Sequence, residues 1–233
     1  MSGHESTRAV WGAAVTSEIE FWRQYLKTRG LSWPDEYAMR LDPRAPLNEQ
    51  QIASRLELFA DETIRILDVG AGPLTVLGKV APGKRLEIHP TDALAESYAQ
   101  LLSELHLNPP VPTIRCDGED LHRKFPPAYF HFAYARNALD HCYDPVQVIR
   151  NMVSVTRVQG WIILRHRPNE AVTAGYAGLH QWNFERSGDD TRVWTAQTSV
   201  SLRDEFHGVA TISTHDDGEW IVTVLQRQAI AAG

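Results

Sequence analysis

A glycine-rich turn and two nearby acids are the first residues in this 233-residue sequence whose types and spacing suggest chemistry. The turn, residues 70–73, directly follows an apolar run, and glycine at 70 and 72 lets the backbone approach a ligand closely. Asp68, just before the turn, would attract a positively charged ligand and repel a pyrophosphate, or it serves only as a structural acid. Asp92 stands past the next apolar run, where a carboxylate can accept from both ribose hydroxyls or cap the following helix.

Two common phosphate-binding motifs fit this turn badly. A P-loop requires Gly-Lys-Ser/Thr after its glycines, whereas this turn continues as Leu74-Thr75-Val76. A dinucleotide fingerprint would place a third glycine or an alanine at position 75. Neither motif therefore describes residues 70–76.

Histidines that follow later apolar runs are the candidates for proton transfer. A histidine with its ordinary pKa near about 6.5 can take a proton from a hydroxyl at neutral pH. His141 is the first candidate base, with Asp140 to orient it, because both follow the fourth predicted strand. His180 is a rival base in a loop rich in aromatic and hydrogen-bonding side chains. Each residue also has an interpretation without chemistry: His141 as a loop histidine that packs against a bound ligand, Asp140 as a solvated loop acid, and His180 as part of a well-packed connecting loop.

The same residues raise the question of a metal ion. Asp140, His141, His166, Glu170 and His180 could converge in the fold. The sequence has no ligand spacing such as HExxH. We therefore expect no metal.

The elements that must position these residues follow an α/β pattern. From residue 64 onward, short apolar runs alternate with amphipathic segments, which predicts parallel strands joined by crossover helices. Helices are clearest at 94–105 and 146–155, and Gly160 is expected to turn the chain back into a strand. The predicted strands of this part are 64–69, 85–89, 113–116, 130–135 and 161–165.

The two ends of the chain differ from this pattern. At the start, Ser17 and Glu20 fit a capping box for a helix that ends at Gly30, and further helices are expected from residue 34 or 35 and over 49–59. The tail predicts strands without intervening helices at 193–196, 209–213 and 220–226. Asp216-Asp217-Gly218 is a good hairpin turn between the last two.

Composition excludes several classes of partner. The formal net charge of -6 and the absence of a Lys/Arg cluster argue against nucleic acid. No apolar run approaches the roughly 18 to 20 residues of a membrane helix, and the first eight residues are polar, so we expect a cytoplasmic protein. Cys116 and Cys142 provide neither a disulfide framework nor a CxxC pair. We expect one domain over 1–233: a helical extension and possible substrate cap (1–48), a cofactor-binding core (49–168), and a substrate loop with antiparallel strands (169–233).

Taken together, residues 64–168 resemble the class I S-adenosylmethionine-dependent methyltransferases. The resemblance is carried by Asp68-Val69-Gly70-Ala71-Gly72, by Asp92, and by the segments 116–121 and 136–141 after the third and fourth strands. Leu74 departs from the family, which often has a third glycine there, and only Gly160 remains of the turn common before the fifth strand. The resemblance implies a Rossmann-like, mostly parallel seven-stranded sheet flanked by helices, with an antiparallel C-terminal strand pair.

The same resemblance implies a set of cofactor-binding residues. Gly70 and Gly72 would approach the methionine part of S-adenosylmethionine and Asp92 would bind its ribose. Asp117 would accept from the adenine amine while Gly118 offers backbone, and the segment beginning at Arg136 is where cofactor and substrate meet in the family. The full set of expected cofactor-binding residues is Asp68, Gly70, Ala71, Gly72, Asp92, Ala93, Asp117, Gly118, Glu119, Arg136 and Asn137.

The predicted activity is methyl transfer to a small polar molecule, most simply O-methylation of a sugar or secondary metabolite, with S-adenosylhomocysteine as product. N-methylation fits nearly as well. A protein that binds the cofactor without transferring methyl and a nicotinamide-dependent reductase are the other classes. The sequence names neither the acceptor nor the base, and it leaves monomer and homodimer open.

Overall fold

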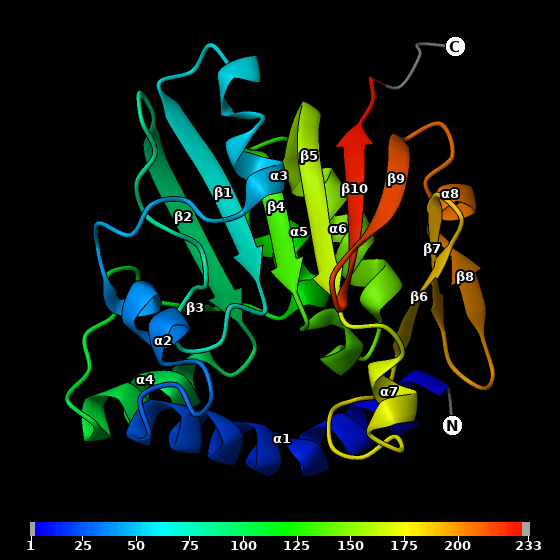
Figure 1. Ribbon diagram of the computed structural model, residues 1–233. Helices are drawn as coiled ribbons and strands as arrows, with labels where there is room; N and C mark the ends of the chain where they lie inside the picture. The colour runs from blue at the N-terminus through cyan, green and yellow to red at the C-terminus, as the bar shows by residue number, and fades with distance from the viewer. Residues whose placement is uncertain (1–2, 230–233) are drawn as a thin grey trace.

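A seven-stranded sheet forms the centre of the molecule in the computed structural model, which describes residues 3–229 and side chains from residue 14 (Figure 1). Its strand order is β3-β2-β1-β4-β5-β10-β9. β1 to β5 run parallel, whereas β10 is antiparallel to both β5 and β9. The strands are β1 (Thr63–Val69), β2 (Arg85–Asp92), β3 (Ile114–Arg115), β4 (Phe130–Arg136), β5 (Thr156–His166), β9 (Ala210–Asp217) and β10 (Trp220–Arg227).

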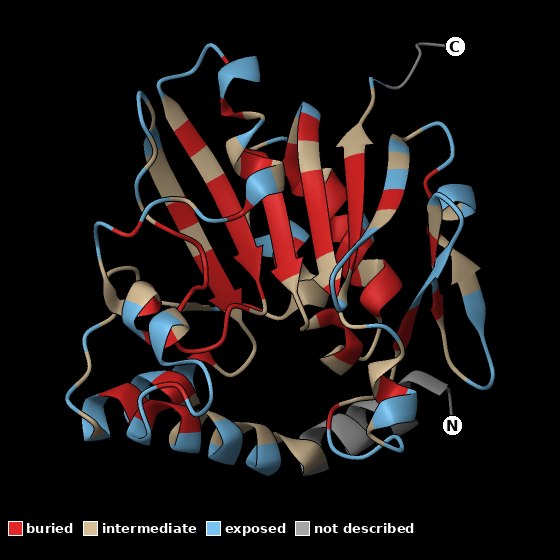
Figure 2. Cartoon of the chain, in the orientation of Figure 1, coloured by how far each residue is buried: buried red, intermediate tan, exposed pale blue. Residues whose placement is uncertain are grey.

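This sheet confirms the predicted fold class, including its antiparallel pair at the end of the chain. The hairpin turn is also as predicted, because Asp217 pairs with Trp220 and Gly218 has a φ of 62°. The strands carry apolar residues on both faces, as buried parallel strands do (Figure 2). In β4, Phe132 and Tyr134 pack on one face of the sheet while Ala133 and Ala135 pack on the other.

Helices cover both faces of the sheet. On one face α6 buries an apolar stripe, and it begins at Pro145 because the Asp144 side chain accepts from the Gln147 N–H at 2.9 Å. On the other face, Ile52, Leu56 and Phe59 pack against the sheet. The α-helices are α1 (Gly3–Lys27), α2 (Pro34–Leu41), α3 (Gln50–Ala53), α4 (Ala95–Glu104), α5 (Leu121–Lys124), α6 (Pro145–Val155), α7 (Glu170–Thr173) and α8 (Leu202–Glu205), with 3-10 turns η1 (Leu56–Leu58), η2 (Gly118–Asp120) and η3 (Leu139–His141). None of these described helices has the length and apolar character needed to cross a bilayer.

The N-terminal helix α1 crosses below the edge of the sheet where the parallel strands end (Figure 1). Tyr25 and Leu26 anchor it in a small apolar cluster with Leu74 and Leu101, so the first helix is packed onto the core rather than attached loosely. The carboxyl ends of parallel strands carry ligand sites in open α/β sheets. The helix therefore forms the far wall of the region where a ligand is expected.

Several boundaries differ from the sequence predictions. Ser17 lies inside α1, where its Oγ donates to the Ala14 carbonyl, so the predicted capping box is wrong. The predicted helix over 49–59 breaks into α3 and η1. Gly160 lies within β5 at a register irregularity, where an added Cβ would meet the His131 carbonyl at 2.8 Å.

A second sheet was largely missed. The strands β6 (Asn183–Ser187), β7 (Asp190–Trp194) and β8 (Ser199–Ser201) form a separate antiparallel sheet, of which the sequence predicted only the segment near 193–196. Phe184 and Val193 anchor it against the same core as α6.

Candidate functional site

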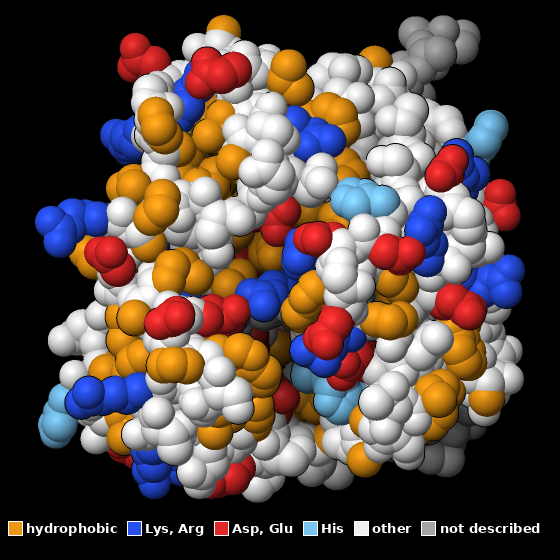
Figure 3. All heavy atoms as spheres, in the orientation of Figure 1, with side chains coloured by type: hydrophobic (Ala, Val, Ile, Leu, Met, Phe, Trp, Pro, Cys, Tyr) orange, Lys and Arg blue, Asp and Glu red, His pale blue; other side chains and the backbone are white. Residues whose placement is uncertain are grey.

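A cavity of about 500 Å³ lies between α1 and the carboxyl ends of β1, β2 and β4. The face drawn in Figure 3 is hollowed near its middle, with acidic and basic side chains around the opening. All the expected cofactor-binding residues line it, as do His141 and His180. Asp140 does not reach the cavity surface, because its side chain is buried directly behind His141 and His180.

The glycine turn forms one end of the cavity and requires glycine at both positions. Gly70 and Gly72 have φ values of 69° and 65°, which side chains rarely adopt. A Cβ on Gly70 would collide with the Ala138 side chain, and one on Gly72 would lie 2.5 Å from the Trp22 ring. The Gly70 and Ala71 N–H groups donate to the Thr91 carbonyl, so the turn is fixed to β2.

Asp92 connects this turn to the helix that follows. Its Oδ2 accepts from the Gly72 N–H at 3.0 Å and its Oδ1 accepts from the Leu94 N–H at 2.8 Å. Burial raises the pKa of the Asp92 carboxyl to about 6. The ligand role and the helix-start role that the sequence left open are thus compatible, since each oxygen keeps a second lone pair.

Asp68 has a structural partner inside the fold. Its Oδ2 accepts from the Thr75 hydroxyl at 2.6 Å, and Thr75 Oγ1 in turn accepts from the Leu77 N–H. Burial raises the pKa of Asp68 to about 6. Asp68 therefore stabilises the loop after the glycine turn while it also lines the cavity.

The third-strand segment lines another part of the cavity. Asp117 pairs with Arg115, and an added Cβ on Gly118 would lie 2.8 Å from the Val148 side chain. Glu119 Oε1 accepts from the backbone N–H groups of Tyr143 and Asp144, both at 3.1 Å. Burial raises the pKa of Glu119 to about 7. Glu119 therefore stabilises the segment before α6 through these two hydrogen bonds.

Arg136 and Asn137 also have partners within the chain. Arg136 Nη1 lies 2.8 Å from Glu36 Oε2, and its guanidinium stacks on Trp220. Asn137 takes a φ of 47°, and its Oδ1 accepts from the Arg167 N–H at 3.1 Å. Both residues tie the end of β4 to neighbouring segments as well as lining the cavity.

The two candidate histidines meet at the cavity wall. His141 Nε2 and His180 Nδ1 are 3.1 Å apart, although the residues are far apart in the chain. His180 Nδ1 lies 2.7 Å from Asp140 Oδ2, whereas His141 Nε2 lies 3.4 Å from the same oxygen. The hydrogen bond to Asp140 raises the pKa of His180. Asp140 therefore orients His180 more closely than His141, the reverse of the pairing expected from adjacency.

His166, the third histidine considered, is not on this wall. It is buried and stacked on Phe184 at 4.0 Å between ring centroids, and burial lowers its pKa to about 4. Neither ring nitrogen has a hydrogen-bond partner among the described residues. His166 thus belongs to the core behind the site.

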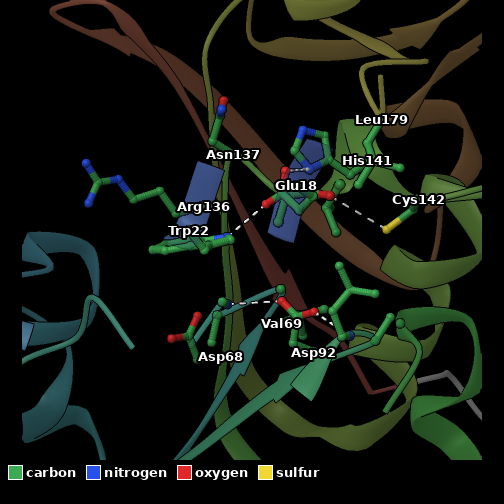
Figure 4. A pocket seen from close by; sticks show the side chains of 18 of the residues that line it. Glu18, Trp22, Asp68, Val69, Asp92, Arg136, Asn137, His141, Cys142 and Leu179 are labelled. Carbon is green, nitrogen blue, oxygen red and sulfur yellow. Dashed lines mark hydrogen bonds and ion pairs between the residues drawn. The ribbon is translucent and has the colours of Figure 1, made fainter. Parts of the chain in front are cut away.

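The sequence analysis missed the acid that α1 contributes. Figure 4 shows Glu18 between Trp22 and His141. Glu18 Oε1 accepts from Trp22 Nε1 at 2.8 Å, and Glu18 Oε2 lies 3.8 Å from His141 Nδ1. The extension over residues 1–48 was expected as a possible substrate cap, and in the structure Trp22 lines the cavity while Tyr25 also packs in the core. Nothing in the sequence alone indicated that Glu18 faces a histidine.

Comparisons with known proteins agree with this geometry. Residues 67–164 match the family model described as a methyltransferase domain. No curated protein matches the chain. An O-methyltransferase family protein from Burkholderia thailandensis is similar in fold, with 13% identity and a TM-score of 0.53 over 93% of this chain and 61% of that one.

Two further solved structures have the same fold. A protein from Methanococcus maripaludis assigned to the S-adenosyl-L-methionine-dependent methyltransferases has 11% identity and a TM-score of 0.52, covering 89% of this chain and 94% of that one. The CurJ carbon methyltransferase has 15% identity and a TM-score of 0.51, covering 76% of this chain. The present chain spans about half of the CurJ structure, 51%.

The sheet order, the glycine turn and the matched residues 67–164 agree with a class I S-adenosylmethionine-dependent methyltransferase. The matched domain implies S-adenosylmethionine as methyl donor and S-adenosylhomocysteine as cofactor product.

Proposed function

We propose that the chain transfers the methyl group of S-adenosylmethionine to an oxygen atom of a small polar molecule held in the same cavity. The observation that carries the proposal is the Asp140–His141–His180 cluster, whose two imidazoles line the cavity that the glycine turn and Asp92 also line. Gly70, Gly72 and Asp92 would hold the methionine and ribose parts of the cofactor. The remaining wall of the cavity is left for the acceptor.

The chemistry needs little beyond alignment and removal of one proton. The cofactor supplies a methyl group already activated by its positive sulfur, so the protein must align the acceptor with it. As the new C–O bond forms and the C–S bond breaks, a hydroxyl acceptor has to lose its proton. We infer that the Asp140–His141–His180 cluster weakens that O–H bond, because it joins two imidazoles to a buried carboxylate at the cavity wall.

The size and lining of the cavity support a small acceptor. A volume of about 500 Å³ must hold both the cofactor and the acceptor. Two exposed aromatic side chains, Phe21 and Trp33, line the cavity. A sugar or another hydroxylated metabolite fits these features, because aromatic faces pack on such rings while acids and imidazoles bind hydroxyls.

The test is a product analysis on the purified chain. S-adenosylmethionine is incubated with acceptor panels that carry hydroxyl, amine or activated-carbon groups, and S-adenosylhomocysteine is followed by mass spectrometry. A methyl ether in the product supports the proposal. Methylation only at nitrogen or carbon would favour those alternatives, and tight binding of the cofactor with no demethylated product in any panel would favour a non-methylating role.

A further inference from the structure

The three atoms at the centre of the histidine cluster lie unusually close together. Asp140 Oδ2, His141 Nε2 and His180 Nδ1 form a triangle with sides of 2.7, 3.1 and 3.4 Å. Asp140 and His141 come from η3, directly after β4, and His180 comes from the loop after α7. The Gln181 N–H donates to the Asp140 carbonyl at 3.1 Å, which fixes that loop against η3.

Protons alone satisfy this triangle poorly. If His180 Nδ1–H donates to Asp140 Oδ2, His141 Nε2 can only accept from that same N–H. A single proton would then be shared between two acceptors. If both nitrogens are protonated, two donors face each other at 3.1 Å. The second oxygen of Asp140, Oδ1, has no hydrogen-bond partner among the described residues, although Asp140 is only 1% exposed.

A divalent cation satisfies the same triangle well. Ligand atoms about 2.0 to 2.1 Å from a zinc-like ion lie roughly 2.9 to 3.4 Å from one another, which matches the 3.1 and 3.4 Å sides of the triangle and is slightly longer than its 2.7 Å side. The three atoms lie within 4.8 Å of one another, which is close enough for one ion to contact all three. The donor set is two neutral imidazole nitrogens and one carboxylate oxygen. Such a set binds first-row transition metals better than it binds Mg²⁺ or Ca²⁺.

The charge around the cluster is that of a cation site. Glu170 Oε2 lies 3.7 Å from His180 Nδ1, and Glu18 Oε2 lies 3.8 Å from His141 Nδ1. In the part of the chain that the structure describes, no Lys or Arg pairs with Asp140, Glu18 or Glu170. Three carboxylates thus surround two imidazoles, and Glu18 stands where a carboxylate commonly orients a metal-bound histidine.

We propose that Asp140 Oδ2, His141 Nε2 and His180 Nδ1 bind one divalent transition metal ion, with Glu18 as the acid that orients His141. Three protein ligands leave a fourth coordination position, and it faces the cavity because His141 and His180 line it. The proposal departs from our expectation of no metal, which rested on the lack of a ligand motif, because ligands that are distant in sequence leave no such motif.

The role of the ion in turnover rests on the proposed function. An acceptor hydroxyl bound to the ion would lose its proton to water in the cavity, and its oxygen would attack the methyl carbon. The electron pair of the broken C–S bond stays on sulfur, which becomes neutral. Binding of the ion itself does not depend on that role and is measured without cofactor.

The binding test uses the full-length chain without a histidine tag, stripped with a chelator and dialysed. Zn²⁺ is titrated by calorimetry, and Co²⁺ is titrated while its visible absorption is followed. We expect one ion per chain, with an absorption intensity typical of a low-coordinate site that includes nitrogen. Absence of one-to-one binding up to about millimolar ion would overturn the proposal.

Matched variants locate the site. His141→Ala, His180→Ala and Asp140→Asn should each abolish one-to-one binding, whereas His122→Ala, at an exposed position on α5, should bind as the unmodified chain does. Glu18→Gln should bind about 10- to 100-fold more weakly, as loss of an orienting carboxylate does. Affinity for S-adenosylhomocysteine and the melting temperature without metal show that each variant is folded. Unchanged metal binding in the His141 and His180 variants would overturn the assignment.

The two proposals fail separately. If the stripped chain methylates an acceptor oxygen as fast as the metal-loaded chain, the ion has no part in turnover and the proposed function stands. If the ion binds through these residues but no methyl ether forms with any acceptor, the metal site stands and the proposed function fails.

Discussion

Replacement of Gly72 by alanine separates two reasons why the turn needs glycine. The added Cβ would sit 2.5 Å from the Trp22 ring, and the residue would keep a φ of 65°. The left-handed backbone costs about 1 to 2 kcal/mol for a residue other than glycine. Overpacking against the indole adds about 1 to 3 kcal/mol. We therefore expect Gly72→Ala to lower the free energy of unfolding by about 2 to 5 kcal/mol.

Gly83 supplies the matched control. Its φ of 69° is nearly the same, but an added Cβ there meets nothing within 4 Å. Gly83→Ala should therefore show only the backbone cost, about 1 to 2 kcal/mol. Urea denaturation of both variants gives the difference, which is the contribution of the Trp22 contact.

The single variant Trp22→Ala and the double variant Gly72→Ala/Trp22→Ala complete a double-mutant cycle. Without the indole, Gly72→Ala should no longer be destabilised by overpacking and should show only the backbone cost. The expected coupling energy between the two positions is about 1 to 3 kcal/mol. If Gly72→Ala and Gly83→Ala destabilise the chain equally, α1 does not press on the glycine turn in solution and the reasoning is refuted.

Three further predictions concern the acids and the histidine of the cavity. Burial raises the pKa of Asp68 to about 6, so its contribution to stability is full below the unfolded-state pKa and is lost as pH rises through about 6. Urea denaturation of the ligand-free chain should therefore show about 1 kcal/mol less stability from this group at pH 7.5 than at pH 5. The variant Asp68→Asn should remove that difference. Asp92→Ala should weaken S-adenosylhomocysteine binding at least about tenfold by calorimetry, because charged hydrogen bonds contribute about 1.5 kcal/mol or more each; binding as tight as that of the unmodified chain would exclude Asp92 from the ribose site. His141→Ala should spare that binding and slow turnover, and unchanged turnover would move the role in the acceptor's activation to His180.

The strands of the main sheet could be predicted from the sequence because the patterns that indicate them are local. Apolar runs such as 64–69 and 130–135, separated by amphipathic segments, can bury both faces only as central parallel strands. The helix that begins at Pro145 could be predicted within one residue because its start has a proline at the first position after a capping acid. In contrast, the strands at 183–187 and 199–201 carry polar residues at most positions, so they have little alternation to detect.

The sequence predicted the cavity residues that belong to a motif, but not the contacts that only the tertiary fold creates. The glycine turn and Asp92 are fixed by residues near them in the chain, so motif and spacing placed both on the cavity wall. Asp140 was expected to orient His141, its neighbour, yet it lies closer to His180 because the loop after α7 folds back onto η3. Glu18 had no sequence signal, since only the crossing of α1 below the sheet brings it to His141.

Glu18 links the two halves of the cavity through a single side chain. One oxygen accepts from Trp22, whose ring packs on Gly72, and the other faces His141. A ligand that displaces the Trp22 ring from the glycine turn must therefore also disturb the acid beside the histidine cluster. Among the described residues of α1, Tyr25 and Leu26 are the ones buried in its apolar cluster, and Glu18 lies about two turns before them. Under the proposed function, this geometry predicts that cofactor binding at the turn and activation of the acceptor at the cluster are coupled, so that each changes the free energy of the other.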